Sequence, residues 1–244
     1  MSIDSPAREA LISRTILSKP SMRRLYEEHY SQYRDVIGRT PTNGLLVELG
    51  AGAGFAKECV PGIITTDVLE YEGVDRVVDA TEMPFADGSV RFIGMINVFH
   101  HIPDVERFLH EVARVLCRGG RILVVDQHNG WISSPILRFL HHEPYCPNEP
   151  QWDFDSSGPL SGANGALAWI VFRRDHGRFE AIFPDLHLVR YEPTAPLKYW
   201  LCGGLTRLNL LPGWAYRCVD RLERFLLALS SNFGSFCYVE IERR

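Results

Sequence analysis

One segment decides the fold of this chain: Val47-Glu48-Leu49-Gly50-Ala51-Gly52-Ala53-Gly54. An apolar run ends in it, three glycines follow at alternate positions, and a short helical segment comes next. This order predicts a strand, a tight turn and a helix. Glycine is needed where the backbone adopts a positive φ, or where a ligand approaches closer than a Cβ would allow. Because open α/β sheets bind nucleotides at the carboxyl ends of their parallel strands, the loop is a candidate nucleotide site.

The spacing of the glycines excludes two common phosphate-binding loops. The dinucleotide pattern G-x-G-x-x-G needs a glycine three residues after Gly52, where Phe55 stands. A P-loop needs Lys-Ser or Lys-Thr after its last glycine, and neither follows. For this segment alone, a glycine-rich turn without a ligand remains the alternative.

The strands expected next also end in acids. Residues 63–67 form the second expected strand, and it closes on Asp67, roughly twenty residues after Glu48. A carboxylate at this position can accept charge-assisted hydrogen bonds from both hydroxyls of a ribose. The alternative is an ordinary turn residue at a strand end. Residues 76–79 form a third strand that ends at Asp79, and residues 90–96 form a fourth.

Two further motifs follow the fourth strand. The first is Asn97-Val98-Phe99-His100-His101-Ile102-Pro103-Asp104, in which Asp104 is a good N-cap for the next helix. The second is Glu111-Val112-Ala113-Arg114-Val115-Leu116-Cys117-Arg118-Gly119-Gly120, whose two glycines we expect to stop that helix through a left-handed cap. Residues 121–126 then predict a fifth strand.

Taken in this order, the motifs across residues 45–126 closely resemble those of the class I S-adenosylmethionine (SAM) methyltransferases, in particular the type 11-like domains that act on small molecules. The glycine loop resembles their acidic first motif, and residues 79–85 resemble "D-A-x-x-L-P-F". Residues 97–104 resemble "L-H-H-hydrophobic-x-D", and residues 111–120 match "E-x-x-R-V-L-x-P-G-G" except for Arg118 in place of proline. Gly94 departs from the family habit of an acid in the fourth strand, which we interpret as a variation in sheet packing.

The resemblance implies an α/β, Rossmann-like fold: a seven-stranded, mostly parallel sheet with helices on both faces and an antiparallel last strand. It implies SAM as the cofactor and S-adenosyl-L-homocysteine as the product. It also assigns the residues that hold the cofactor: Glu48, Gly50, Ala51, Gly52, Gly54, Asp67, Val68, Asp79, Ala80, Asn97 and Val98.

The 244 residues fit a single methyltransferase domain in three parts. Residues 1–40 form an N-terminal helical cap divided at Pro20, residues 41–130 the SAM-binding core, and residues 131–244 a lid or substrate-binding region with the last two strands. Residues 141–165, rich in Pro, Gly, Ser and Asn, predict a long loop. Two sets of aromatic residues either line the active site or pack in the core. The first set is Tyr26, Tyr30 and Tyr33, and the second is Trp131, Trp152, Trp169, Trp200 and Trp214.

The composition of the chain limits which binding partners and which cellular location we expect. The net charge of −4 gives no basic face and argues against a nucleic-acid substrate. The six cysteines form no C-x-x-C pair, no apolar run approaches the length of a membrane span, and we expect a cytoplasmic protein without a transmembrane segment. Residues 215–229 predict an amphipathic helix whose apolar side packs in the core or, as the less favoured interpretation, contacts a membrane or a lipid-linked substrate at its surface.

Methyl transfer from a sulfonium mainly requires the acceptor to be held in line and water to be excluded. A general base is needed only when a proton leaves early, as from a hydroxyl. His101, then His100 and His128, are the candidate bases, and a purely structural role is the alternative. His141-His142-Glu143 suggests a metal, but adjacent histidines point differently and no third histidine follows at ligand spacing, so we expect no metal site.

The sequence therefore predicts a SAM-dependent methyltransferase that acts on a small-molecule or lipid- or sugar-linked acceptor, with oxygen as the preferred acceptor atom. Two alternatives remain: a methyltransferase for a protein or nucleic acid, which a basic rim around the pocket would support, and a SAM-binding protein without catalysis.

Overall fold

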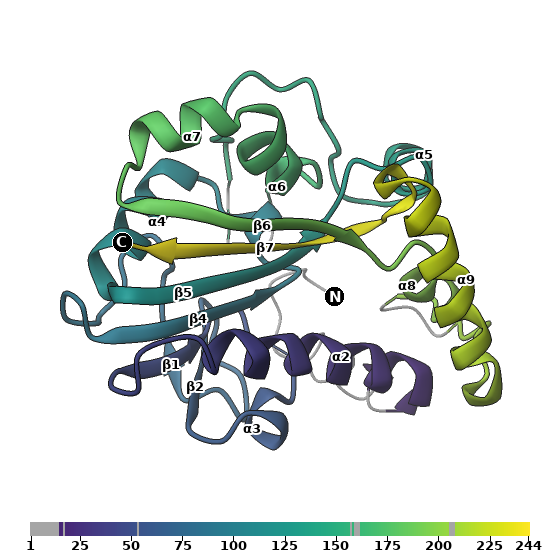
Figure 1. Cartoon of the computed structure of the whole chain (residues 1–244), viewed down its shortest axis with the longest axis horizontal. Helices are drawn as coiled ribbons and strands as arrows, with labels where there is room; N and C mark the ends of the chain where they lie inside the picture. The colour runs from purple at the N-terminus through teal and green to yellow at the C-terminus, as the bar shows by residue number, and fades with distance from the viewer. Residues whose placement is uncertain (1–14, 17, 53, 157, 159–161, 205–207) are drawn as a thin grey trace.

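A seven-stranded sheet lies at the centre of the computed structural model, which describes residues 15–16, 18–52, 54–156, 158, 162–204 and 208–244 (Figure 1). Its strands are β1 (Leu45–Glu48), β2 (Ile63–Asp67), β3 (Arg76–Val77), β4 (Val90–Ile96), β5 (Leu116–Gln127), β6 (Leu186–Thr194) and β7 (Phe236–Arg243). They lie in the order β3-β2-β1-β4-β5-β7-β6. Neighbouring strands from β3 to β5 pair in parallel, whereas β7 runs antiparallel between β5 and β6. The predicted fold is confirmed.

Helices cover both faces of the sheet. They are α2 (Pro20–Ile37), α3 (Ala56–Cys59), α4 (Val105–Val115), α5 (Ser133–Phe139), α6 (Leu167–Trp169), α7 (His176–Ile182), α8 (Lys198–Leu201) and α9 (Tyr216–Leu229), with a π-helical turn η2 (Ile170–Arg174) and short 3-10 turns η1 (Phe99–His101), η3 (Gly213–Ala215) and η4 (Ser231–Phe233). In Figure 1, α2 runs along one side of the sheet and α6 and α7 lie on the other. The same view shows α5, α8 and α9 gathered beyond the ends of β4 and β5.

The alternation of side chains along the central strands explains the two layers. Successive residues of a strand point to opposite faces. Ile93 and Val124 belong to the buried cluster that includes α4, α6 and α7. Their neighbours Phe92 and Leu123 belong to the cluster that includes α2. The central strands are therefore apolar on both faces, as expected for parallel strands with helices on each side.

The transition from α4 to β5 differs from the prediction. Asp104 caps α4 as expected, since its side chain accepts a hydrogen bond from the backbone N–H of Arg107. The helix does not reach Gly119-Gly120, however: it ends at Val115, and Leu116 is extended and pairs with Val90 of β4. Burial of Leu116 in the sheet ends the helix earlier, so the expected glycine cap is wrong. Gly119, at φ 75°, instead lies inside β5.

The long segment before α6 carries no helix or strand between residues 141 and 165, as far as it is described. Trp152 anchors it, because its side chain is buried and its indole N–H donates to Asp175 at 2.9 Å. Asp153 forms an isolated bridge with Asp104. The predicted loop is thus confirmed, and it is pinned to the helical layer.

The favoured interpretation of helix α9 is right only in part, since Val219 packs against the buried core but other apolar side chains of the helix are exposed. Leu222 is 46% exposed, Phe225 60% and Leu229 63%. These residues recur at helical spacing, so they form one apolar stripe toward solvent. Within the described part of the chain, no helix is both long enough and apolar enough to cross a bilayer.

Gly94 lets α2 approach the sheet. A Cβ at this residue of β4 would lie 2.4 Å from two ring carbons of Tyr33, which is fully buried on α2. The ring of Tyr33 also contacts Phe92, with centroids 5.1 Å apart. The structure thus gives a packing reason for the departure from the family pattern at Gly94.

We predict that Gly94→Val destabilises the fold by about 1–3 kcal/mol, because the added atoms overpack the Tyr33 ring. In a domain of this size that corresponds to a fall in Tm of roughly 2–12 °C by thermal unfolding. Gly177→Ala is the control, since its Cβ would meet no atom within 4 Å, and its Tm should not fall. An unchanged Tm for Gly94→Val would contradict this account of the packing.

Candidate active site

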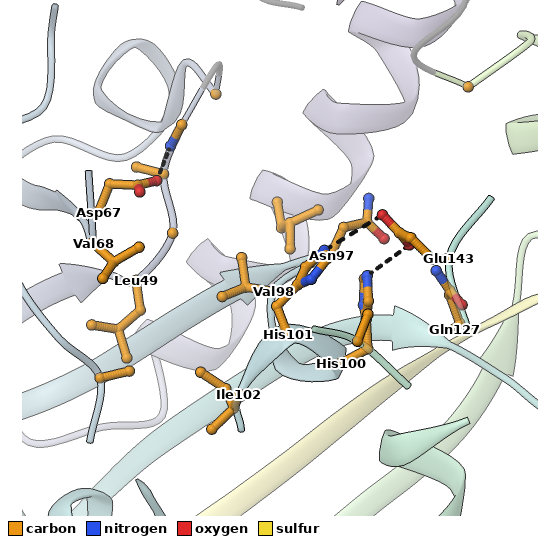
Figure 2. Close-up of a pocket in the computed structure, with 18 of the residues that line it drawn as sticks. Leu49, Asp67, Val68, Asn97, Val98, His100, His101, Ile102, Gln127 and Glu143 are labelled. Carbon is orange, nitrogen blue, oxygen red and sulfur yellow. Dashed lines mark hydrogen bonds and ion pairs between the residues drawn. The ribbon is translucent and has the colours of Figure 1, made fainter. Parts of the chain in front are cut away.

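A large cavity opens at the carboxyl ends of β1, β2, β4 and β5, with a volume of about 1090 Å³. Every residue that the sequence assigned to the cofactor lines it, and so do His100 and His101. Figure 2 shows Asp67 and Val68 on one side of this space, Asn97 and Val98 in the middle, and His100, His101 and Glu143 on the other. The parallel sheet therefore brings distant motifs into one site.

The glycine loop owes its composition partly to contacts within the protein. Gly50 has φ 65°, and a Cβ there would lie 2.3 Å from a methyl carbon of Val98. A Cβ on Gly54 would lie 2.6 Å from the hydroxyl oxygen of Tyr30, which also accepts the backbone N–H of Phe55. The fold alone therefore requires two of the three glycines, Gly50 and Gly54.

The side chain of Glu48 is buried and lines the cavity. Burial raises the pKa of its carboxyl group to about 8, and the charge of nearby Asp67 acts in the same direction. Its Oε2 atom has no hydrogen-bond partner among the described residues. A buried polar atom without a partner costs free energy, so this oxygen suits a ligand that brings a donor or a positive charge.

Asp67 closes β2 and holds the glycine loop. Its carboxylate accepts the backbone N–H of Gly52 at 3.0 Å and that of Leu69 at 3.1 Å. Burial raises the pKa of Asp67, and these hydrogen bonds oppose the rise. Asp79 lies just beyond β3, is exposed, and accepts the N–H and the hydroxyl of Thr81 at 2.7 Å.

His100 forms a buried ion pair with Asp126 at the end of β5, with 2.7 Å between Nδ1 and Oδ1. Burial by itself would lower the pKa of His100, but the charge of Asp126, its hydrogen bond and the neighbouring Glu143 raise it to about 10. At neutral pH the imidazole is therefore protonated and is not a base.

His101 and Glu143 complete the cluster. The Nδ1 of His101 lies 3.1 Å from the carbonyl oxygen of Gly162 and donates to it, because a carbonyl can only accept. Burial and the charge of His100 lower the pKa of His101 to about 4, so its Nε2 keeps a free electron pair toward the cavity. For Glu143, burial would raise the pKa, but the hydrogen bond and charge of His100 hold it at about 2.

His128, the third candidate base, does not line the cavity. Its Nδ1 lies 2.8 Å from the hydroxyl of Tyr191, and burial together with the charge of Arg173 lowers its pKa to about 4. The structure brings His100 and His101 together and leaves His128 apart.

Residues 47–124 match a family model described as a methyltransferase domain. This segment is therefore a methyltransferase domain of the class I SAM-dependent type. The chain is 32% identical to an uncharacterized methyltransferase, YcgJ, of Bacillus subtilis, over 40% of this chain and 46% of that protein. It is 29% identical to the chloroplastic tocopherol O-methyltransferase of Arabidopsis thaliana, over 33% of this chain and 29% of that protein. It thus spans less than half the length of both relatives.

Solved structures agree on the fold of the methyltransferase. Geranyl diphosphate C-methyltransferase from Streptomyces coelicolor, in complex with Mg²⁺, geranyl diphosphate and S-adenosyl-L-homocysteine, superposes with a TM-score of 0.54 at 14% identity, over 91% of this chain and 82% of that one. The [4+2]-cyclase SpnF superposes with a TM-score of 0.51 at 14% identity, over 88% and 81% of the two chains. One fold thus supports different reactions, and function has to be argued from the site.

The sequence analysis missed Gln127 as a lining residue and left the aromatic residues undecided between the cavity and the core. Gln127 follows Asp126, and its Oε1 has no hydrogen-bond partner among the residues described. Of the five tryptophans only Trp200 lines the cavity; Trp152 is buried, and Trp131 and Trp214 are exposed. Tyr26 and Tyr30 of α2 also line it, whereas Tyr33 does not. No motif marks these residues, because they come from loops and helix faces that only the tertiary fold brings together.

We predict that Asp67→Ala weakens SAM binding roughly tenfold to 150-fold, that is by about 1.5–3 kcal/mol, because it removes a charge-assisted acceptor from the cavity. Calorimetric titration with SAM measures this. Asp75→Ala is a matched control, since Asp75 also accepts backbone N–H bonds but does not line the cavity. An equal loss in both variants would assign the effect to the fold of the loops instead.

We also predict that, in protein freed of metal ions with a chelator, His100 is doubly protonated at pH 7 and His101 is neutral. The ¹⁵N chemical shifts of labelled histidines measure both protonation states. Because the pKa of His100 rises from 6.5 to about 10, its pairing stabilises the fold fully below pH 6.5 and less as the pH approaches 10. Asp126→Asn should lower that pKa. A neutral His100 in the wild-type protein at pH 7 would contradict the proposed ion pair.

Proposed function

We propose that this chain transfers the methyl group of SAM to a hydroxyl oxygen of a bulky, largely apolar small molecule. The observation that carries the proposal is the single cavity, which joins the cofactor motifs to the histidine cluster. Its volume of about 1090 Å³ exceeds the range of roughly 300–1,000 Å³ usual for one ligand. Space for a cofactor and an acceptor side by side supports a two-substrate reaction.

The residues at the glycine loop fit SAM. The unpartnered oxygen of buried Glu48 suits the positively charged amino group of the methionine part. Asp67 suits the ribose hydroxyls and Asp79 the adenine amino group, in line with the family resemblance. SAM would supply the electrophilic methyl group, and these side chains would fix its orientation toward the histidines.

The histidine side of the cavity suits an oxygen acceptor. In the reaction the bond between sulfur and the methyl carbon breaks, a bond from the acceptor oxygen to that carbon forms, and the hydroxyl proton leaves. Of the three candidate bases, His101 combines a position on the cavity with a neutral ring. Glu143, 3.6 Å from its Nε2, would stabilise the positive charge that His101 gains with the proton.

The far wall of the cavity suits an apolar acceptor. Ile136, Leu140, Trp200 and Leu208 line it, and Leu140 is 81% exposed at its rim. The exposed stripe on α9 adds apolar surface at the same end of the molecule, as Figure 1 shows for α5 and α9. This arrangement supports a lipid- or sugar-linked acceptor that is reached at a membrane surface.

The test is a titration with SAM and S-adenosyl-L-homocysteine, followed by transfer of a labelled methyl group to lipid, glycolipid and hydroxylated small-molecule fractions. We expect micromolar binding of both cofactor forms and label in an O-methyl product. Gly52→Val should abolish binding by filling the cofactor space. A folded wild-type protein that binds neither compound would overturn the proposal.

We predict that His101→Ala lowers turnover by about 10²–10⁴-fold, the range typical of a general base, and leaves SAM affinity unchanged. His128→Ala is the comparison, because that ring lies outside the cavity lining, and its turnover should change little. Loss of SAM affinity in His101→Ala would indicate a structural role, and a larger loss of turnover in His128→Ala would move the base to His128.

A further inference from the structure

Four histidines surround the carboxylate of Glu143. Imidazole nitrogens of His100, His101, His141 and His142 lie 3.4, 3.6, 3.6 and 3.7 Å from its oxygens. Charge-assisted hydrogen bonds are shorter, at about 2.7–2.9 Å. The four pairs are therefore longer than strong charge-assisted hydrogen bonds.

The longer spacing fits ligands of a metal ion. Two ligand atoms that each lie about 2.1 Å from a tetrahedral cation are about 3.4 Å apart. One ligand atom from each of His100, His101 and Glu143 falls within 4.8 Å of the others. Figure 2 shows both rings pointing toward Glu143 across a short gap, with dashed lines to its oxygens.

The partners on the far side of both rings also fit ligation. Metal-bound histidines almost always donate their other ring N–H to a carboxylate or a backbone carbonyl. His100 donates from Nδ1 to Asp126, and His101 donates from Nδ1 to the carbonyl of Gly162. Both bonds leave Nε2 toward Glu143, and both orient the ring before a ligand arrives.

The local charge favours a dication. Asp126 is fully buried and the side chain of Glu143 is 22% exposed, so two carboxylates stand close together with little water. No lysine or arginine forms an ion pair with either of them in the described part of the chain. A divalent ion that displaces the Nε2 proton of His100 would bring two positive charges between the carboxylates in place of one.

We propose that His100, His101 and Glu143 bind a divalent transition-metal ion, with Asp126 as the residue that positions His100. Two imidazoles and one carboxylate favour ions such as Zn²⁺, Fe²⁺ or Co²⁺ over Mg²⁺ and Ca²⁺, which prefer oxygen ligands alone. Three protein ligands leave coordination positions open toward the cavity. In the proposed methyltransferase, on which this step rests, those positions would take an acceptor through its oxygen atoms. His101 would act as the base in the metal-free site and as a ligand once the ion is bound, when the ion itself would lower the pKa of the acceptor hydroxyl.

The sequence pattern His141-His142-Glu143 by itself did not predict this site. The fold supplies the missing ligands from His100 and His101, more than forty residues earlier, through a loop that crosses the end of the sheet. His141 is nearby but lies outside the group of three converging atoms.

The test is calorimetric titration of the chelator-treated full-length protein with Zn²⁺, and with Co²⁺, whose visible absorption reports the ligands. We expect one equivalent per chain, at least tenfold weaker binding in Glu143→Gln and His101→Ala, and a 10- to 100-fold loss in Asp126→Asn. His176→Ala is the matched control: it removes a histidine from a surface pair with Glu180, also at 3.4 Å, and should keep full binding. Thermal melts check that each variant is folded.

No binding of either ion to the folded wild-type protein would overturn the inference, and so would stoichiometric binding that Glu143→Gln and His101→Ala both leave unchanged. Titration with SAM separates this inference from the proposed function. SAM binding without metal binding removes only the metal site. Metal binding without SAM binding keeps the metal site and contradicts the proposed methyl transfer.

Discussion

The parallel pairing of β4 with both β1 and β5 is the constraint on which the site depends. Since the three strands run in the same direction, their carboxyl ends lie at one edge of the sheet, and the residues that follow these ends lie close together. Glu48, His100 and Asp126 come from these three ends. The pairing thus turns separate sequence motifs into one buried polar centre, and the ion pair between His100 and Asp126 joins two adjacent strand ends.

Much of the fold and of the cofactor side of the site could be predicted, because both follow from local patterns. The strand ending at Asp67 and the strand at residues 90–96 have the predicted bounds. Each expected cofactor residue lies within a few residues of a strand end, so the prediction of the strands also placed it on the cavity. The glycine cap at Gly119 failed because Leu116 pairs with Val90, a contact between strands that no local pattern reveals.

The acceptor side could not be predicted in the same way. Glu143 lies in a segment without helix or strand, and its place beside His100 and His101 depends on how that segment crosses the sheet edge. The apolar stripe on α9 shows the same limit: its helical spacing was visible in the sequence, but which side would face solvent depended on packing against α8 and β6. The periodicity of apolar residues shows which side chains share one face of a helix, but not which face of the helix packs against the protein.

The anchoring of the loop by Trp152 has a consequence for how this architecture diversifies. The indole is fixed to Asp175 and covered by the guanidinium of Arg178, which lies 4.3 Å from the ring centroid. The stretch that carries Glu143 is thereby anchored at Trp152, which lies in neither the sheet nor the glycine loop. Sequence changes between α5 and Trp152 can therefore change the shape of the cavity near Glu143 and leave the glycine loop intact. This makes the stretch suitable for loop grafting to alter selectivity.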